Sequence, residues 1–333
     1  MLWDTHMHSQ YSGDSDAPQE DMIRAAIRAK LPGICFTDHL DIDYPDNPEA
    51  FLLDLPNYTS SVFAMQEQYR DQISVRYGIE LGLQPHLAAL HADILSQYDF
   101  DFVIGSSHVV HGYDPYFPPF WKTHTEEEGY REYFESILEN IRAFDDFDVY
   151  GHIDYVVRYG PTRNENYTYA RYSDVIDEIL RLLIEKGKGI EINTGGVKYG
   201  LGHPNPCEEI LARYRELGGE IITVGADAHA PEHVEQPQHV VVIGDAQVPP
   251  DLVFLDVCGV NGNEDLHVVL QLLEHQADRV ALCAPTGRAA KRLSELTGRK
   301  ASTIHRLLEV DYSGGVVSFI HNDKNLLKCD VVI

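Results

Sequence analysis

The sequence of 333 residues predicts an α/β fold built on a parallel sheet. Up to about residue 234, seven short apolar runs alternate with helical patterns, and this alternation is typical of an open doubly wound sheet or a closed barrel. The glycine-rich dinucleotide fingerprint follows none of the runs, which weighs against a nucleotide-binding open sheet. In chain order the predicted strands are LWDTHMH, GICFTDH, VRYGIEL, DFVIGSSH, DVYGHIDYV, GIEINT and IITVGADAH.

The stretches between these runs have the apolar spacing of amphipathic helices. Apolar side chains that recur every three to four residues form one face, which packs against the sheet. In chain order the predicted helices are PQEDMIRAAIRAK, QPHLAALHADILSQY, EEEGYREYFESILENIRAF, SDVIDEILRLLIEKG and PCEEILARYRELG.

Composition narrows the class of protein. Hydrophobic residues make up 44% of the chain and charged residues 24%, which is typical of a globular protein. The sequence contains no apolar run of the roughly 18 residues that a membrane span requires. The net charge is −27, from 26 basic and 53 acidic residues, and so acidic a surface repels nucleic acid and anionic lipid. We therefore expect neither nucleic acid nor a membrane as a partner.

The N-terminus and the cysteines favour a cytoplasmic protein. The first ten residues, MLWDTHMHSQ, have neither the basic nor the apolar region of a signal peptide. The cysteines are scattered and have no CxxC spacing, which excludes a cysteine-based zinc site and fits a reducing compartment. They are Cys35, Cys207, Cys258, Cys283 and Cys329.

Ionisable residues gather at the C-terminal end of every predicted strand. Residues two apart on a strand share a face, and in a parallel α/β barrel the C-terminal ends of the strands form the functional face. Imidazoles and carboxylates together suit Zn, Fe or Mn better than Mg or Ca. The alternative is a set of hydrogen-bonded polar residues, but burying so many ionisable groups is costly without a cation. The pattern comprises Asp4, His6 and His8; Thr37 and His39; Gly78 and Glu80; Ser106 and His108; His152 and Asp154; Glu191 and Asn193; and Asp227 and His229.

The ordered motifs of residues 1 to about 234 resemble the PHP (polymerase and histidinol phosphatase) superfamily. Within it they are most similar to the monofunctional histidinol-phosphate phosphatase branch. An HxH followed much later by a DxH is a weak signal alone, whereas the full ordered set is highly specific. The motifs are DTHMHSQYSGDS, FTDH, GIELG, GSSHVV, GHIDYVVRY, EINTGG and GADAH.

The resemblance implies a distorted (β/α)7 TIM-like barrel that holds three divalent transition-metal ions, Zn, Fe or Mn. Glu80 would bridge the first and second metals. Many superfamily members carry His at the position of Asp14, and Asp there is the tendency of the phosphatase branch. By position, the first metal would be held by His6, His8, Glu80 and Asp227, the second by Glu80, His108 and His152, and the third by Asp14, His39 and His229.

The resemblance also implies a phosphoric monoester hydrolase that converts L-histidinol phosphate, in histidine biosynthesis, to L-histidinol and phosphate. A bridging carboxylate holds two metals roughly 3.5–4 Å apart, and a hydroxide between them would attack phosphorus in line. The third metal would neutralise the phosphate oxygens. The alternative is a PHP-type phosphoesterase acting on another small phosphate ester or a nucleotide. The residues expected to be catalytic are Glu80, Asp227, His229 and Asp154.

A phosphate dianion also needs fixed cations. Arg158, six residues after His152, is the first candidate, because Arg binds phosphate through two parallel hydrogen bonds. A surface arginine facing the many acids is the alternative. Lys198 stands where the phosphatase family that this chain resembles tends to carry Arg. A lysine keeps the positive charge but lacks the planar guanidinium that donates two parallel hydrogen bonds. Asp154 would orient His152 or meet the substrate amine, and a structural hydrogen bond is the alternative.

The C-terminal part, about 265–333, resembles RecD-like superfamily 1 DNA helicases, with APTGRAAKRLSE the most specific segment. A phosphate-binding GxxxxGK[ST] loop is expected before it, where this chain reads CGVNGNED. Glu264 and Asp265 occupy the Lys and Thr positions, and their carboxylates repel ATP. A module that binds ATP or DNA is therefore the less favoured alternative function.

These patterns predict three parts. Residues 1–234 form the phosphatase barrel, 235–263 a junction, and 264–333 a truncated, non-functional helicase-like fragment with a small incomplete α/β structure. Within the fragment we expect helices at EDLHVVLQLLEHQ and GRAAKRLSEL, strands at RVALCAP and LLKCDVVI, and a hairpin at DYSGGVVSFIH.

Overall fold

A computed structural model of the chain describes residues 3–235, 280–284, 294, 300–303, 310–311, 318–319 and 331–332. The chain divides into two units, Leu2–Ile243 and Gly244–Ile333. The first unit contains the elements from β1 to α9, and the second contains the strands β9 to β13.

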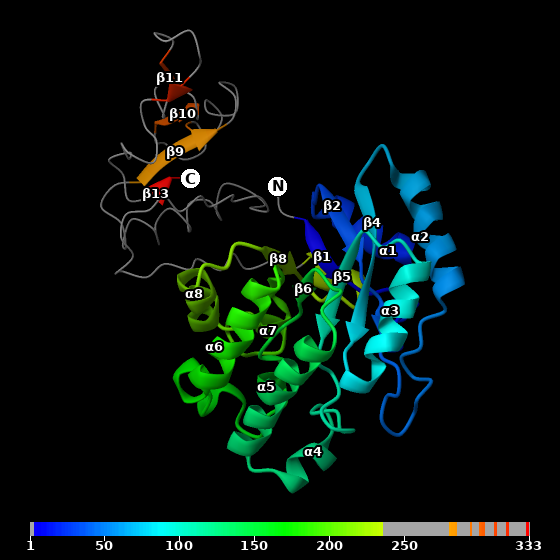
Figure 1. The fold of residues 1–333 in the computed structure, drawn as a ribbon. Coiled ribbons are helices and arrows are strands. Elements are labelled where there is room, and N and C mark those ends of the chain that lie inside the picture. Colours follow the sequence, from blue (N-terminus) through cyan, green and yellow to red (C-terminus); the bar gives the residue numbers. More distant parts are fainter. Residues whose placement is uncertain are drawn as a thin grey trace. The chain divides into compact units, whose positions relative to one another are not determined.

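Seven parallel strands form the centre of the first unit (Figure 1). A two-residue strand, β3 (His39–Leu40), pairs with β4 beside the main path. The predicted strands are all present, and the predicted parallel α/β fold is confirmed. In sheet order they are β1 (Asp4–Met7), β2 (Gly33–Phe36), β4 (Ser74–Gly82), β5 (Phe102–Ser106), β6 (Val149–Tyr150), β7 (Gly189–Asn193) and β8 (Ile222–Gly225).

Hydrogen bonds between β1 and the segment after β8 draw the two ends of the sheet together. The backbone N–H of His8 donates to the carbonyl of Ala228 at 2.9 Å, and the N–H of Asp227 donates to the carbonyl of His6 at 2.9 Å. The carboxylate of Asp4 accepts from the N–H of Ala226 at 3.0 Å. These contacts bring the first and last strand ends side by side, as the predicted barrel requires.

Most of the strands are apolar because both of their faces are buried, whereas β8 is partly exposed. Ile34, Phe36, Ile79, Ile104 and Ile190 have no exposed surface. Parallel strands covered on both sides read as continuous apolar runs, which explains why the sequence shows runs rather than alternation.

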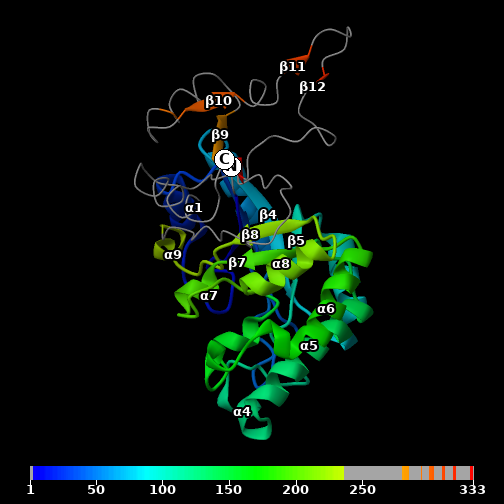
Figure 2. The ribbon, with the colours of Figure 1, turned by 90° about the vertical axis from the view of Figure 1, so that its left-hand side faces the viewer.

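Helices cover the outside of the strands. Helix α6 contacts both α5 and α8, and the three helices lie on the same side of the sheet (Figures 1 and 2). Among the described residues, no helix has both the length and the apolar character needed to cross a membrane. The longer helices are α1 (Gln19–Arg28), α2 (Leu55–Tyr69), α3 (Ala88–Gln97), α5 (Glu126–Ala143), α6 (Tyr169–Glu185) and α8 (Glu208–Glu216), and the shorter ones are α4 (Pro118–Thr123), α7 (Gly195–Lys198) and α9 (Pro231–Glu235).

Helix α2 is absent from the predicted helices, although the other five long helices were expected. It buries only Tyr58, Val62 and Tyr69, so its apolar stripe is thin and its periodicity weak. Its start signals are local: Asp54 accepts a hydrogen bond from the N–H of Asn57, and a proline follows at the first turn.

Helix α5 begins at a capping box. The hydroxyl of Thr125 accepts from the N–H of Glu128 at 3.3 Å, and the Glu128 carboxylate accepts from the N–H of Thr125 at 2.9 Å. Two backbone donors that have no partner within the helix are thereby satisfied. The helix places Tyr133, Phe134 and Ile137 in the core, so its stability contributes directly to that of the barrel.

We expect Thr125→Ala to lower the free energy of unfolding by about 1 kcal/mol, because a helix cap of this kind contributes that much. Urea unfolding followed by circular dichroism measures the change. Thr125→Ser keeps the hydroxyl and serves as the control, with a midpoint close to that of the unaltered chain. An Ala variant as stable as the Ser variant would contradict the role of the cap.

The second unit has two small groups of described strands. β9 (Val280–Ala284) lies between β10 (Ala301–Thr303) and β13 (Val331–Val332), and all three are parallel. β11 (Val310–Asp311) and β12 (Ser318–Phe319) pair antiparallel, as expected of the hairpin. The expected strands at RVALCAP and LLKCDVVI thus correspond to β9 and β13. The two expected helices, residues 236–263 of the junction and the positions of Glu264 and Asp265 lie outside the described residues, apart from Ser294.

Candidate metal centre

Glu80, on β4, lies at the centre of the clustered imidazoles and is completely buried. Its Oε2 atom lies 3.1 Å from Nε2 of His6 and 3.6 Å from Nε2 of His8. Its Oε1 atom lies 3.3 Å from Nε2 of His108 and 3.0 Å from Nε2 of His152. The two oxygens of one carboxylate therefore face two separate groups of imidazoles, as a bridging ligand would.

Asp227 joins the first of these groups from the segment after β8. Its Oδ1 atom lies 3.4 Å from Nε2 of His8 and 4.0 Å from Nε2 of His6. The residue has a left-handed backbone, with φ of 54°, a conformation that Asp tolerates better than most side chains. The hydrogen bond from its N–H to His6 holds it there, so the closure of the sheet also positions the carboxylate.

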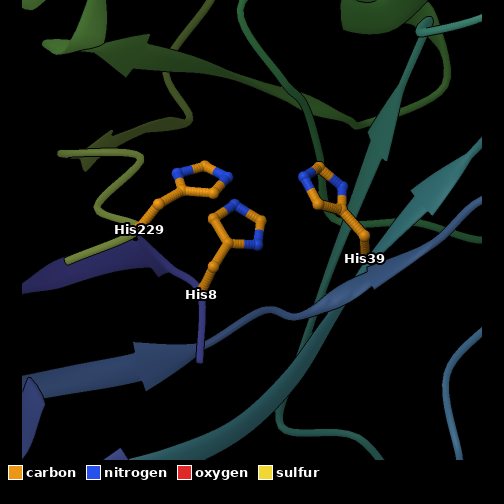
Figure 3. Close-up of side chains that lie close together, drawn as sticks. All are labelled: His8, His39 and His229. Carbon is orange, nitrogen blue, oxygen red and sulfur yellow. The ribbon is translucent and has the colours of Figure 1, made fainter. Parts of the chain in front are cut away.

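A third group brings the imidazoles of His8, His39 and His229 close together (Figure 3). His8 stacks on His39 and on His229, with ring centroids 4.2 and 4.1 Å apart. Oδ2 of Asp14 lies 3.0 Å from Nε2 of His229 and 3.7 Å from Nε2 of His39. His39 also approaches Glu80, since its Nδ1 lies 3.0 Å from Oε2. All nine predicted ligands thus lie close together. The third group contacts the first through His8 and through the approach of His39 to Glu80.

The charges of the cluster compensate one another. Burial by itself raises the pKa of Glu80, but the imidazoles of His6, His39 and His108 hold that pKa well below its usual range. Burial lowers the pKa of His8, and the neighbouring His229 lowers it further. The lowered pKa favours the neutral form of His8, which is the form of imidazole that binds a metal.

Carboxylates outside the predicted ligand set orient two of the imidazoles. Oε1 of Glu191 lies 2.6 Å from Nδ1 of His6, and Oδ1 of Asp41 lies 2.8 Å from Nδ1 of His108. A carboxylate on one ring nitrogen fixes which nitrogen faces the metal. Glu191 was visible at the end of its strand. Asp41 follows His39 by two residues, and that spacing was its only sequence signal.

A pocket that is open to solvent lies beside the cluster. One side is formed by six of the predicted ligands: Asp14, His39, His108, His152, Asp227 and His229. The remainder of the lining includes Arg158 and the aromatic residues Tyr44, Phe51, Tyr155, Tyr159 and Tyr199.

Arg158 lines this pocket and is 3% exposed, so it is not a surface arginine. Its Nε donates to Asn205 at 2.8 Å, its Nη1 to Oδ2 of Asp227 at 2.9 Å, and its Nη2 to Asn193 at 2.8 Å. The guanidinium also lies over the ring of Tyr199, at 4.8 Å from the centroid. These bonds use three of its five N–H groups.

Lys198 and Asp154 are placed differently from Arg158, and neither is among the residues that line the pocket. Nζ of Lys198 donates to the backbone carbonyl of Asp227 at 3.0 Å, and burial lowers the pKa of this lysine. The Asp154 carboxylate accepts from the side chain of Asn205 at 2.6 Å and from the N–H of Cys207 at 2.9 Å. These contacts favour the structural hydrogen bond over an orienting contact with His152.

The comparisons with known proteins agree with this geometry. The model of the PHP domain matches residues 4–195. A histidinol-phosphatase of Lactococcus lactis is 33% identical over 231 residues, which cover 68% of this chain and 83% of the relative. The chain belongs to the PHP family.

A PHP-family structure shares the barrel. The crystal structure of histidinol phosphate phosphatase from Lactococcus lactis, which contains zinc, L-histidinol and phosphate, superposes with a TM-score of 0.65 at 30% identity. The match covers 72% of this chain and 94% of that one. The predicted resemblance to the histidinol-phosphate phosphatase branch is confirmed.

The C-terminal residues match a different family. The model of an AAA domain matches residues 264–333. The ATP-dependent RecD2 DNA helicase of Deinococcus radiodurans is 48% identical over 65 residues, which are 20% of this chain and 8% of the helicase. The predicted resemblance of this segment to RecD-like helicases is confirmed, over a small part of such a helicase.

The donor set of this PHP barrel fits transition-metal ions. Nε2 of His8 is buried and has no hydrogen-bond partner among the described residues. A buried nitrogen without a partner is costly, and coordination would satisfy it. Imidazole nitrogens and carboxylate oxygens approach one another closely enough to share an ion in four groups: His8, His39 and His229; His6, His8 and Glu80; His39, Asp41 and His108; and Glu80, His108 and His152.

Proposed function

We propose that this chain is a metal-dependent phosphomonoesterase that hydrolyses L-histidinol phosphate to L-histidinol and phosphate. The observation that carries the proposal is the pocket, in which a buried Arg158 lies beside six of the nine converging metal-ligand candidates. Two comparisons support the choice of substrate: the histidinol-phosphatase of Lactococcus lactis, and the crystal structure from that organism that contains L-histidinol and phosphate.

Three divalent transition-metal ions, Zn, Fe or Mn, would occupy the cluster. Glu80 would bridge two of them, because its oxygens face opposite groups of imidazoles. The neighbour structure supports zinc in particular. The proposed ligands are His6, His8, Glu80 and Asp227 for the first ion, Glu80, His108 and His152 for the second, and Asp14, His39 and His229 for the third.

When bound, the metal ions supply an activated water and positive charge at the phosphate. Arg158 adds a fixed cation, and its N–H groups that are not bonded to other described residues can donate to phosphate oxygens. Asp227 divides its carboxylate between the two functions, with Oδ1 toward His8 and Oδ2 toward Arg158. The aromatic residues that line the pocket exclude water around the organic part of the substrate.

The decisive experiment measures phosphate release from L-histidinol phosphate by the purified chain with its metals quantified. A panel of small phosphate esters and nucleotides tests the alternative substrates in the same assay. We expect bound metal, loss of activity with a chelator and the highest kcat/KM for L-histidinol phosphate. A chain that contains no metal and whose activity does not change with a chelator would exclude the proposal. A higher kcat/KM for a nucleotide would favour the alternative phosphoesterase.

We further propose that residues 1–234 are the catalytic part and that residues 264–333 are a non-functional helicase-like fragment. Each of the nine proposed ligands precedes Ala230. Helix α9 contacts α1 and buries Val234, so the barrel needs the chain up to this helix. The sequence positions of Glu264 and Asp265 support the absence of ATP binding by the fragment.

A variant that ends at Glu235 is therefore expected to keep the metal content and the kcat/KM of the full chain. Mass spectrometry of the bound metals and the phosphatase assay measure both. The full chain is expected to show no ATP hydrolysis, with or without DNA. A shortened chain that stays folded but loses metal, or DNA-stimulated ATP hydrolysis by the full chain, would contradict this division of the protein.

A further inference from the structure

Two buried residues behind the pocket hold one edge of the Arg158 guanidinium. Nε of Arg158 donates to Oδ1 of Asn205 at 2.8 Å. The amide nitrogen of Asn205 donates in turn to Oδ1 of Asp154 at 2.6 Å. Asp154 and Asn205 have no exposed surface, and neither lines the pocket. The three side chains form one hydrogen-bonded chain that ends at the pocket.

The chemistry of the three side chains determines which group donates and which accepts in each of these hydrogen bonds. A guanidinium can only donate hydrogen bonds, so Asn205 must present its oxygen to Arg158. An asparagine amide can rotate by half a turn and present its NH2 group instead, which would oppose one donor with another. The Asp154 carboxylate accepts from that NH2 group and holds the amide in the productive orientation.

Asp154 is itself held on its other oxygen. Its Oδ2 accepts from the backbone N–H of Cys207 at 2.9 Å and from the hydroxyl of Tyr167 at 3.3 Å. These bonds leave Oδ1 to Asn205. The oxygen and the amide nitrogen of Asn205 both have partners, and satisfied buried hydrogen bonds of this kind make side chains rigid.

We propose that Asp154 and Asn205 are positioning residues that orient Arg158 for the phosphate group of the substrate. The inference rests on the proposed function, because it takes Arg158 as the phosphate-binding cation. With Nε anchored by Asn205 and the ring of Tyr199 against the guanidinium, rotation of the fork is blocked. The N–H groups of Nη1 and Nη2 that are not bonded to any described residue then keep a fixed direction for two phosphate oxygens.

The first test replaces Asp154 by Asn in the full, metal-loaded chain. An amide at 154 can donate as well as accept, so it no longer selects one orientation of Asn205. Calorimetry with inorganic phosphate as the ligand is expected to show about tenfold weaker binding, the lower end of the effect of a charge-assisted hydrogen bond. The kcat/KM for L-histidinol phosphate is expected to fall by the same factor while the metal content stays unchanged.

Asp177→Asn is the matched control. Asp177, on α6, is also a buried carboxylate that accepts several hydrogen bonds, from Tyr169, Arg181 and Arg213, but it does not line the pocket. Its replacement is expected to lower the melting temperature and to leave phosphate affinity unchanged. A general effect of losing a buried carboxylate would instead weaken phosphate binding in both variants and would overturn the proposal.

The second test asks whether Asp154 acts through Arg158. In an Arg158→Ala background, Asp154→Asn is expected to cause no further loss of phosphate affinity, because the residue that it positions is gone. Additive losses would overturn the proposal, and so would loss of metal in the Asp154→Asn variant. If that variant does not fold, Asn205→Ala replaces it in both measurements, with the same expected loss.

Failure of the proposed function gives a different result. If the unaltered chain binds phosphate but does not hydrolyse L-histidinol phosphate, the substrate is wrong, and the phosphate affinities of the variants still decide the positioning role. Equal phosphate affinity in the unaltered chain, Asp154→Asn and Asn205→Ala would overturn the role of both residues.

Discussion

Glu80→Gln is expected to release metal and to lower kcat by more than about a hundredfold. Mutating residues that only support metal ligands already costs about 10–100-fold, and Glu80 contacts both groups of imidazoles itself. The amide keeps the size of the side chain but removes the negative charge that faces His6, His39 and His108. Metal analysis and steady-state kinetics on the same preparation measure the two effects.

Ser106→Ala is the matched control for Glu80→Gln. The hydroxyl of Ser106 donates to Oε1 of Glu80 at 2.6 Å, so this variant loses one hydrogen bond of the carboxylate but keeps its charge. We expect it to retain its metal and most of its activity. A Glu80→Gln chain with full metal content and normal kcat would show that the carboxylate is not a bridging ligand.

Arg158→Ala is expected to raise KM and to lower kcat/KM for a phosphate ester by about ten- to a hundredfold, the worth of one charge-assisted contact. The substitution also removes one donor from the oxygens of Asn193 and Asn205 and from one oxygen of Asp227, and Asn193 keeps the N–H of Gly195. Steady-state kinetics together with metal analysis separates a loss of phosphate binding from a disturbance of Asp227 as a ligand.

Two further variants test the geometry of the cation. Arg158→Lys keeps the charge without the planar fork, so we expect it to recover only part of the lost kcat/KM. Lys198→Ala removes a cation whose ammonium donates to a backbone carbonyl. We expect this variant to lower kcat/KM less than Arg158→Ala does. Unchanged kinetics in Arg158→Ala would mean that Lys198 or the third metal carries the phosphate.

The sequence by itself determined the parts of the fold that depend on local pattern. The seven apolar runs predicted seven strands, and the polar residues that follow them predicted that His6 and His8, and later Asp227 and His229, lie at the strand ends. Helices α1, α3, α5, α6 and α8 were predicted from their apolar spacing, whereas α2, whose apolar spacing is weak, was not.

Tertiary structure alone decided what surrounds the candidate phosphate site. Arg158 is bonded to Asn193 and Asn205, which lie 35 and 47 positions away in the chain, and to Asp227, which lies 69 positions away. Asp154, two residues after His152, turns to Asn205 rather than to the imidazole beside it in sequence. Periodicity records which face a residue shares with its near neighbours. It does not record which loops meet when a sheet brings its strand ends together, so these contacts exist only in the folded chain.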